Sequence, residues 1–276
     1  MNGEPQFAAE FALSITDALR TQLLERLDEL TPVALTSENL AKVAQKGGIY
    51  ELFLDNDLVY VGKSAKKLNS RLNRHRTKLA GRLGNLLQHV KFRCLYVSED
   101  LDALAPEKML ITELGTIWNN NGFGNNDPGR NRDRSLVSSA HFDSHYPINL
   151  DLEQEINLIG DDDILLSDLF KVVKQSLPFN FRYSDSAQSD LGPIVVPVSV
   201  LPKQPVAIRD WLQVAADYLP ANWELIALPG YVIAYPNIDP TKHESRVGHW
   251  ELLDGKRAFR QHAPKWSTTA VDQSEA

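Results

Sequence analysis

Two tyrosines ten residues apart are the side chains in this sequence most able to do chemistry. Tyr50 ends Gly48-Ile49-Tyr50, and Tyr60 begins Tyr60-Val61-Gly62-Lys63. Apolar residues flank both, and Asp55-Asn56-Asp57 between them is typical of a turn, so residues 48–63 are predicted to form a β-hairpin. If the register allows it, adjacent strands bring the two phenols and the Lys63 amine to one side of the sheet.

A helix with one packed face is predicted after this hairpin. Its period of three and four residues is given by Leu68, Leu72, His75 and Leu79. Arg71 and His75 then share a face, where a fixed cation and a proton carrier could approach one phosphate. A solvated basic helix is the alternative for this histidine.

A carboxylate is predicted at the start of a second helix. After a strand-like run from Lys91 to Val97, Pro106 suits a first helical position and Gly115 suits the stop. Glu107 would therefore lie in a rigid first turn, as a metal ligand requires. Asn119, shortly after, could offer a neutral oxygen or a phosphate-facing amide.

In this order and spacing, these groups resemble the GIY-YIG nuclease family over roughly residues 47–119. The continuation is similar to the type II restriction endonucleases of that family that cut GC-rich palindromes. It reads Trp118-Asn119, then Gly122-Phe123-Gly124-Asn125-Asn126-Asp127-Pro128-Gly129, and later Phe142-Asp143-Ser144-His145-Tyr146-Pro147. Val61 stands where isoleucine is usual and Thr116 where that subfamily commonly has proline, but neither change removes a chemical group.

The resemblance implies a small, mainly antiparallel three-stranded sheet flanked by helices, and catalytic roles for Tyr50, Tyr60, Lys63, Arg71, His75, Glu107 and Asn119. Tyr50 would be the base or orient the water, Arg71 would contact the scissile phosphate and His75 would assist proton transfer. The base itself stays open, because a tyrosine pKa near 10 must be lowered by nearby cations. Glu107 would hold Mg²⁺, or Mn²⁺ in its place, since one carboxylate is sufficient protein ligation.

Charge along the chain favours DNA as the partner. Between Lys63 and Arg93 every charged residue is basic, which is an electrostatic footprint for a phosphate backbone. The expected backbone contacts are Lys66, Lys67, Arg74, Arg76 and Lys78. A second cluster, Arg130, Arg132 and Arg134, could reach base edges, or could belong to a solvated loop.

The composition sets further limits on function. With 43% hydrophobic and 24% charged residues among 276, the chain is typical of globular proteins. It lacks the apolar stretch of a membrane span and the pattern of a signal peptide, so a cytoplasmic protein is expected. Cys94 is the single cysteine, which excludes a disulfide framework or a zinc cluster within one chain.

The net charge of −7 is unevenly divided, which predicts a domain boundary near residue 150. Residues 1–150 hold 18 acids and 18 bases, whereas residues 151–276 hold 18 acids and 11 bases, so the second half is expected to stay off DNA. The predicted parts are an N-terminal helical segment (1–46), a nuclease domain (47–150) and an α/β accessory domain of unknown role (151–276).

Within the second half, we predict helices at 164–177 and 206–219 and a strand at 194–200. A hairpin is predicted at 223–235, with its turn at Pro229-Gly230. The four tryptophans of the second half, Trp211, Trp223, Trp250 and Trp266, are expected in the core, and a partner-binding surface is the alternative. His243, His249 and His262 fit no ligand motif and are expected at the surface.

The leading interpretation is a magnesium-dependent, sequence-specific endonuclease that cuts double-stranded DNA as a type II restriction enzyme. A homodimer or homotetramer is expected, because a palindrome presents two equivalent strands. A cognate DNA methyltransferase would be encoded nearby without being a stable subunit. The alternatives are a repair, homing or mobile-element nuclease with the same core, and a non-catalytic DNA-binding or interaction module.

Overall fold

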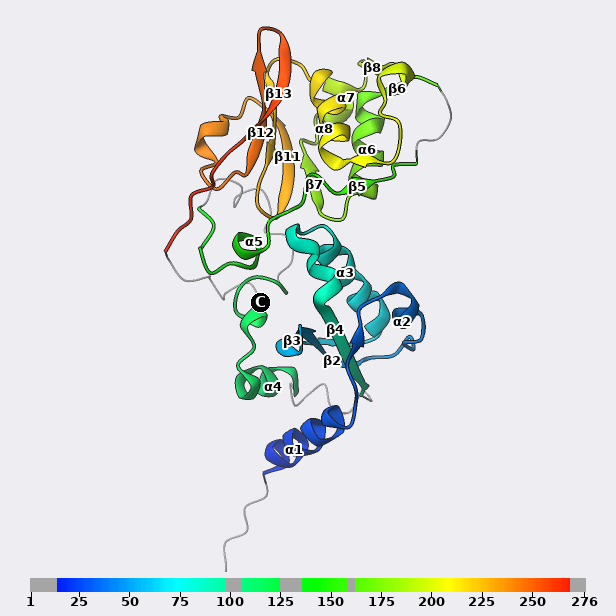
Figure 1. Ribbon diagram of the computed structural model, residues 1–276, viewed down its shortest axis with the longest axis vertical. Helices are drawn as coiled ribbons and strands as arrows, with labels where there is room; N and C mark the ends of the chain where they lie inside the picture. Colours follow the sequence, from blue (N-terminus) through cyan, green and yellow to red (C-terminus); the bar gives the residue numbers. More distant parts are fainter. Residues whose placement is uncertain (1–13, 98–105, 125–135, 158–161, 269–276) are drawn as a thin grey trace, which may run out of the picture. The chain divides into compact units, whose positions relative to one another are not determined.

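The structure, a computed structural model, describes residues 14–97, 106–124, 136–157 and 162–268. The chain is mixed α/β and divides into two compact units (Figure 1). Unit 1 comprises residues 1–72 and 90–117, and unit 2 comprises residues 73–89 and 118–276. The expected boundary near residue 150 stays a prediction, because contacts group residues 118–150 with the C-terminal half.

Unit 1 is built on an antiparallel sheet with the strand order β1-β4-β2-β3. Its strands are β1 (Val33–Ala34), β2 (Gly48–Leu54), β3 (Asp57–Ser64) and β4 (Val90–Tyr96). The predicted hairpin is confirmed, and its turn holds Asp55 and Asn56 at φ values of 55° and 131°, which Asp and Asn tolerate better than most residues. The short edge strand β1 adds a fourth strand to the three expected.

Four helices surround this sheet or leave it: α1 (Ile15–Asp28), α2 (Ser37–Ala41), α3 (Leu68–Ala80) and α4 (Pro106–Leu114). α3 and α4 are the two helices predicted around Arg71 and Glu107, and α1 and α2 lie in the predicted N-terminal helical segment. The side chains of Ser14 and Thr36 cap α1 and α2 by accepting backbone N–H bonds. α3 passes from unit 1 into unit 2 after Leu72.

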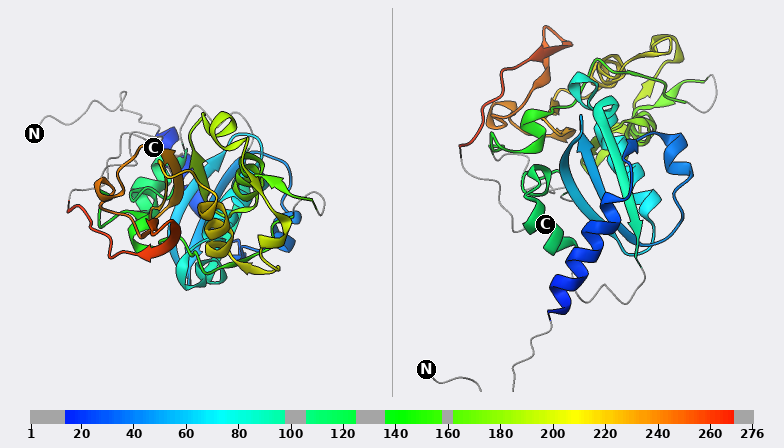
Figure 2. Two further views of the ribbon diagram at one scale, coloured as in Figure 1. Left: turned by 90° about the horizontal axis from the view of Figure 1, so that it is seen from above. Right: turned by 60° about the horizontal axis from the view of Figure 1, so that its bottom comes forward.

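The two faces of the unit 1 sheet carry different side chains, because successive residues of a strand alternate. Ile49 and Val61 lie on the face covered by α1 and α4, where leucines complete a small core: Leu23, Leu27 and Leu110. The C-terminal half of α1, drawn in blue, meets the strands there (Figure 2). Tyr50 and Tyr60 consequently lie on the opposite face, toward α3.

Unit 2 contains a five-stranded sheet with the order β13-β12-β10-β11-β7, in which only the β11–β7 pair is parallel. The strands are β7 (Asn180–Tyr183), β10 (Trp223–Ala227), β11 (Tyr231–Pro236), β12 (Gly248–Leu253) and β13 (Lys256–Gln261). Two small strand pairs accompany it, β5 (Glu153–Gln154) with β9 (Val206–Ala207) and β6 (Ile164–Leu165) with β8 (Val195–Val196). The hairpin predicted around Pro229-Gly230 is confirmed as β10–β11.

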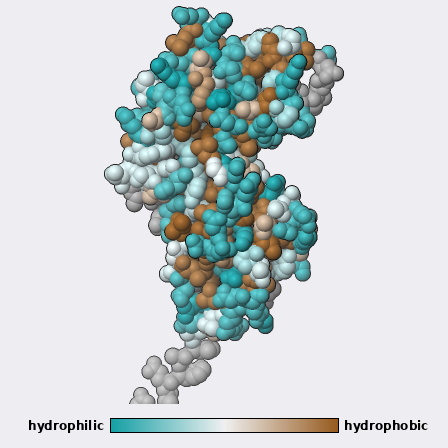
Figure 3. All heavy atoms as spheres, viewed as in Figure 1, coloured by the Kyte–Doolittle hydropathy of each residue, from teal (hydrophilic) through white to brown (hydrophobic). Residues whose placement is uncertain are grey.

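Helices α6 (Leu166–Ser176), α7 (Ala187–Leu191) and α8 (Ile208–Asp217) pack against that sheet. Unit 2 also contains the short helix α5 (Phe142–His145). The chain has 3₁₀ turns at η1 (Leu83–His89), η3 (Ile117–Asn119), η5 (Val198–Val200) and η6 (Pro240–Lys242). The large core between α6, α8 and the sheet contains Trp211, Trp223 and Trp250, so the expected burial of these three tryptophans is confirmed. The prediction is wrong for Trp266, which is half-buried and lies outside this core. Leu252 and Leu253, at the end of β12, are exposed. The face of the molecule drawn in Figure 3 is largely hydrophilic, with smaller hydrophobic patches between the hydrophilic residues.

Three predictions for the second half are wrong in detail. The strand expected at 194–200 is reduced to β8, because Pro197 lacks a backbone N–H and a 3₁₀ turn follows it. The helices expected from 164 and 206 begin two residues later, since β6 and β9 take those positions. His243 and His249 are buried rather than at the surface; His249 faces Ile226 of β10 across the sheet.

No helix in the described ranges is long and apolar enough to cross a membrane.

Candidate active site

Two tyrosines and an arginine meet on one face of the unit 1 sheet. Tyr50 stands opposite Gly62, and Tyr60 stands opposite Leu52 in the same pair of strands. The phenol rings have centroids 6.0 Å apart and are tilted by 39°. Arg71, in the first turn of α3, donates from Nε to the Tyr50 hydroxyl at 3.3 Å. Both tyrosines are buried and the arginine is half-buried, so strands and helix hold the three groups in place.

The glycines of the two motifs are explained by close contacts. A β-carbon at Gly62 would collide with the hydroxyl and ring of Tyr50 and with the ring of Tyr60. A β-carbon at Gly48 would collide with the backbone oxygen of Leu95 in β4. The glycine of Tyr60-Val61-Gly62 therefore provides the space in which the two phenols pack.

The pKa of Tyr50 is shifted in the direction opposite to the one expected from nearby cations. Burial raises this pKa well above 10, and the neighbouring Tyr60 raises it further, which outweighs the lowering by Arg71. Burial also opposes the charge of Arg71, but the two phenol oxygens more than offset it and raise the arginine pKa. Tyr50 is thus a neutral phenol and Arg71 a permanent cation at neutral pH.

Lys63 does not join this cluster. It pairs with Ile49 in the β2–β3 register, and alternation along β3 directs it to the face opposite Gly62 and Tyr60. Its side chain is exposed. The hairpin therefore brings together the two phenols but not the amine.

The other expected catalytic residues lie in different parts of the chain. Glu107 occupies the first turn of α4, as predicted, but its side chain lies outside the described part of the structure. His75 belongs to unit 2, where it is 3% exposed and stacks on Phe123 with ring centroids 4.8 Å apart. Asn119 is half-buried at the end of η3. The burial of His75 differs from both a solvated helix face and an open catalytic position.

The expected DNA contacts are placed unequally. Lys66, Lys67 and Arg74 are exposed, whereas Arg76 is half-buried and donates from Nε to Asn73 at 3.1 Å. Lys78 is half-buried in unit 2. Arg130, Arg132 and Arg134 lie outside the described residues.

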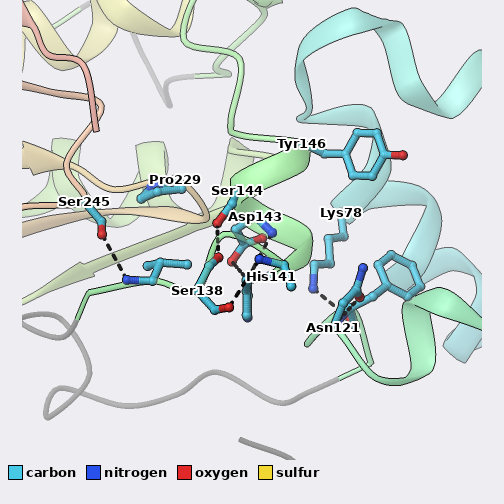
Figure 4. A network of polar contacts seen from close by, with 12 residues as sticks. Lys78, Asn121, Ser138, His141, Asp143, Ser144, Tyr146, Pro229 and Ser245 are labelled. Atoms are coloured by element: carbon cyan, nitrogen blue, oxygen red, sulfur yellow. Dashed lines mark hydrogen bonds and ion pairs between the residues drawn. The ribbon is translucent and has the colours of Figure 1, made fainter. Parts of the chain in front are cut away.

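Within unit 2, described residues from 121–124 and 136–146 form a polar and aromatic network around α5 (Figure 4). Lys78 reaches from α3 to the Phe123 carbonyl at 2.8 Å and lies over the Phe123 and Phe142 rings. Arg82, which is buried, pairs with Asp143 at 2.8 Å and donates to the Tyr146 carbonyl at 2.8 Å. These contacts bind residues 73–89 to residues 118–147.

Asp143 is the charged centre of this network. Burial alone would raise its pKa, but Arg82, Lys78 and His141 together hold that pKa below its usual value. The charge pattern of the sequence assigns the basic residues between Lys63 and Arg93, which include Lys78 and Arg82, to a DNA-facing surface. That pattern alone therefore misses the role of Lys78 and Arg82 in balancing the charge of the buried Asp143. A signal was available in the sequence, since a buried arginine needs a carboxylate and Asp143 is the only acid between residues 136 and 150.

No cluster of three or more His, Cys, Asp or Glu side chains suited to a metal ion occurs in the described ranges. The chain matches no known family model, and no curated protein matches it either.

Proposed function

We propose that this chain is an endonuclease that hydrolyses phosphodiester bonds in double-stranded DNA, of the type II restriction kind. The observation that carries the proposal is the hydrogen bond from Arg71 to Tyr50 beside Tyr60. These three residues follow one another with the spacing of the GIY-YIG resemblance. A fixed cation next to an oriented hydroxyl suits a reaction that needs charge stabilisation and a positioned water.

In the proposed reaction, a water attacks phosphorus and the bond to the leaving oxygen breaks. Arg71 balances the charge that develops on the phosphate oxygens. Tyr50 orients the water as a neutral hydroxyl, because its raised pKa makes it a poor base. Tyr60 fixes the position of Tyr50. The roles expected for His75 in proton transfer and for Asn119 in phosphate contact stay predictions, since both residues belong to unit 2.

Magnesium is proposed as the cofactor, with Glu107 as its protein ligand and Mn²⁺ able to replace it. When bound, such an ion supplies charge to the transition state and to the leaving oxygen. The side chain chemistry fits a hard cation, since magnesium is satisfied by one carboxylate together with water and phosphate oxygens.

Double-stranded DNA is the proposed partner, contacted along its backbone by the exposed Lys66, Lys67 and Arg74. Base reading by residues 130–134, assembly into a homodimer or homotetramer, and a cognate methyltransferase encoded nearby belong to the same proposal. Such a neighbouring gene would separate the restriction role from a repair, homing or mobile-element nuclease.

A non-catalytic DNA-binding module is the second candidate, and the burial of Tyr50 favours it. Its hydroxyl is engaged with Arg71 and its ring is 0% exposed. A catalytic role requires a water or phosphate to approach these groups. Cleavage itself therefore decides between the two candidates.

The test is cleavage of long duplex DNA of known sequence in magnesium, with the ends mapped. We expect discrete cuts by the full chain, and a loss of at least about 100-fold in rate for Tyr50→Phe and for Glu107→Gln, with DNA affinity measured in EDTA unchanged. Tyr50→Phe removes one hydroxyl and keeps the ring. Glu107→Gln removes the charge of the proposed metal ligand.

Glu113→Gln is the matched control, because Glu113 lies on the same helix, is exposed and pairs with Arg20 at 2.8 Å. It should cut at nearly the normal rate. DNA binding without cleavage by the full chain would favour the non-catalytic module. Normal cutting by the Glu107 variant would remove Glu107 from the chemistry.

A further inference from the structure

One strand pair of the acidic half carries a local excess of basic groups. Between residues 243 and 267 there are five Lys or Arg residues and three Asp or Glu residues, although residues 151–276 as a whole are acidic. In the β12–β13 register, His249 stands opposite Arg260. Trp250 and Phe259 form the next pair and pack into the core, so alternation places His249 and Arg260 on the other face.

Two histidines are joined on that face. His249 Nδ1 and His262 Nε2 are 2.8 Å apart, and the rings stack with centroids 4.9 Å apart and an interplanar angle of 24°. One nitrogen of the bond must donate and the other accept, so the ring that accepts is neutral. Neither ring makes a second hydrogen bond within the described part of the chain.

Two arginines lie close enough to this histidine pair to act on both rings. Arg246 and Arg260 both act electrostatically on the two imidazoles, and Glu251 is the one acid that opposes them. Glu251 is already paired with Arg260 at 2.8 Å. Burial, His262 and Arg246 lower the pKa of His249 to about 4, and burial and the same arginines lower that of His262.

Arg246 also carries an unused donor. Its Nη1 donates to the His243 carbonyl at 3.2 Å, but its buried Nε has no hydrogen-bond partner among the described residues. A buried N–H without an acceptor is costly. An oxyanion beside Arg246 and the histidine pair would balance the excess positive charge, and a rotation of the Arg246 side chain would bring its Nε–H to that oxyanion.

We propose that Arg246, His249, Arg260 and His262 form a second phosphate-binding site, which contacts the backbone of the DNA on which the enzyme acts. This inference rests on the proposed function. The site recognises a phosphate oxyanion through arginine and imidazole N–H groups and carries no sequence information, as is typical of backbone contacts. It assigns part of the C-terminal half to DNA binding.

The first test measures DNA affinity in EDTA over a series of salt concentrations. Arg246→Gln and Arg260→Gln should each weaken binding on all sequences and reduce the slope of log K against log salt by about 0.9. Arg260→Lys keeps the charge and should retain the slope. Arg209→Gln is the matched control, because Arg209 is an exposed arginine of unit 2 paired with Asp151 at 2.9 Å.

A second test uses the unaltered full chain, so it does not depend on the variants folding. The imidazole signals of His249 and His262 are followed by NMR while pH is varied, with and without a short non-cleavable duplex or inorganic phosphate. We expect the duplex to raise the pKa of the pair by about 1 unit. A response to inorganic phosphate but not to the duplex would overturn the assignment to DNA.

The outcomes separate this inference from the proposed function. Unchanged salt slopes in both arginine variants, in a protein that still cuts DNA, would overturn the second site and leave the nuclease intact. Reduced slopes in a protein that never cuts DNA would support the second site and overturn the nuclease.

Discussion

At the scale of single residues, the candidate site depends on the absence of a side chain at Gly62 as much as on the side chains of Tyr50, Tyr60 and Arg71. Gly62 leaves the space in which Tyr50 lies against Tyr60. That packing buries the phenol and raises its pKa, so the residue expected to act as the base is a neutral phenol at neutral pH. Arg71, which is half-buried, is the more accessible group of the three.

Gly62→Ala should therefore destabilise unit 1 by about 1–3 kcal/mol, as overpacking does. The reason is the collision of the added methyl group with Tyr50 and Tyr60. The measurement is urea unfolding of four proteins: the normal chain, Gly62→Ala, Tyr50→Ala and the double variant. In the Tyr50→Ala background most of the alanine cost should disappear. Equal costs in the two backgrounds would show that the ring does not occupy that space.

At the scale of elements, the two ends of α3 contact different groups of residues. Its first turn presents Arg71 to the tyrosines, whereas its last turns supply Lys78 to the aromatic rings around Phe123. Arg82, just after the helix ends, donates to the carbonyls of Tyr146 and Pro229 at 2.8 and 3.4 Å. The run of basic residues thus changes from exposed side chains to structural ones, which are half-buried at Lys78 and buried at Arg82.

Arg82→Leu should lower the free energy of unfolding by about 3–5 kcal/mol, because it leaves Asp143 buried without its partner. Arg209→Leu is the control, since its pair with Asp151 is exposed and should be worth at most about 1 kcal/mol. Both are measured by urea unfolding at pH 7. A loss for Arg82→Leu no larger than that of the control would show that the ion pair does not hold these segments together.

At the scale of the whole molecule, local patterns predicted the elements better than the contacts between them. Alternation and turn residues gave the β2–β3 hairpin, and periodicity gave α3. The opposite orientation of Lys63 required the register, which the sequence pattern alone leaves open. The burial of His249 depends on β10, which is distant in sequence. The sign of the charge also gave a wrong prediction, because Arg82 belongs to the basic run expected at a DNA-facing surface but is buried.

The division of the chain gives the last prediction, for a fragment that ends after Leu150. The charge pattern predicts a folded nuclease domain, but the contacts predict the reverse. Ile148 and Leu150 lie in the core formed with α6, α8 and β10, and the Ile148 N–H bonds to the Pro229 carbonyl at 2.8 Å. Truncation exposes both apolar residues and removes that acceptor.

Fragment 1–150 should accordingly lack a fixed environment for its single tryptophan, Trp118, which packs against Phe123, Phe142 and Tyr146 in the full chain. We expect red-shifted tryptophan emission and no cooperative thermal transition in the residues around it. A fragment ending after Thr268 retains every described residue and should melt like the full chain, which controls for truncation itself. A cooperative transition of fragment 1–150 with buried Trp118 emission would show that the boundary near residue 150 is right, because residues 73–89 and 118–150 would then fold without the C-terminal core.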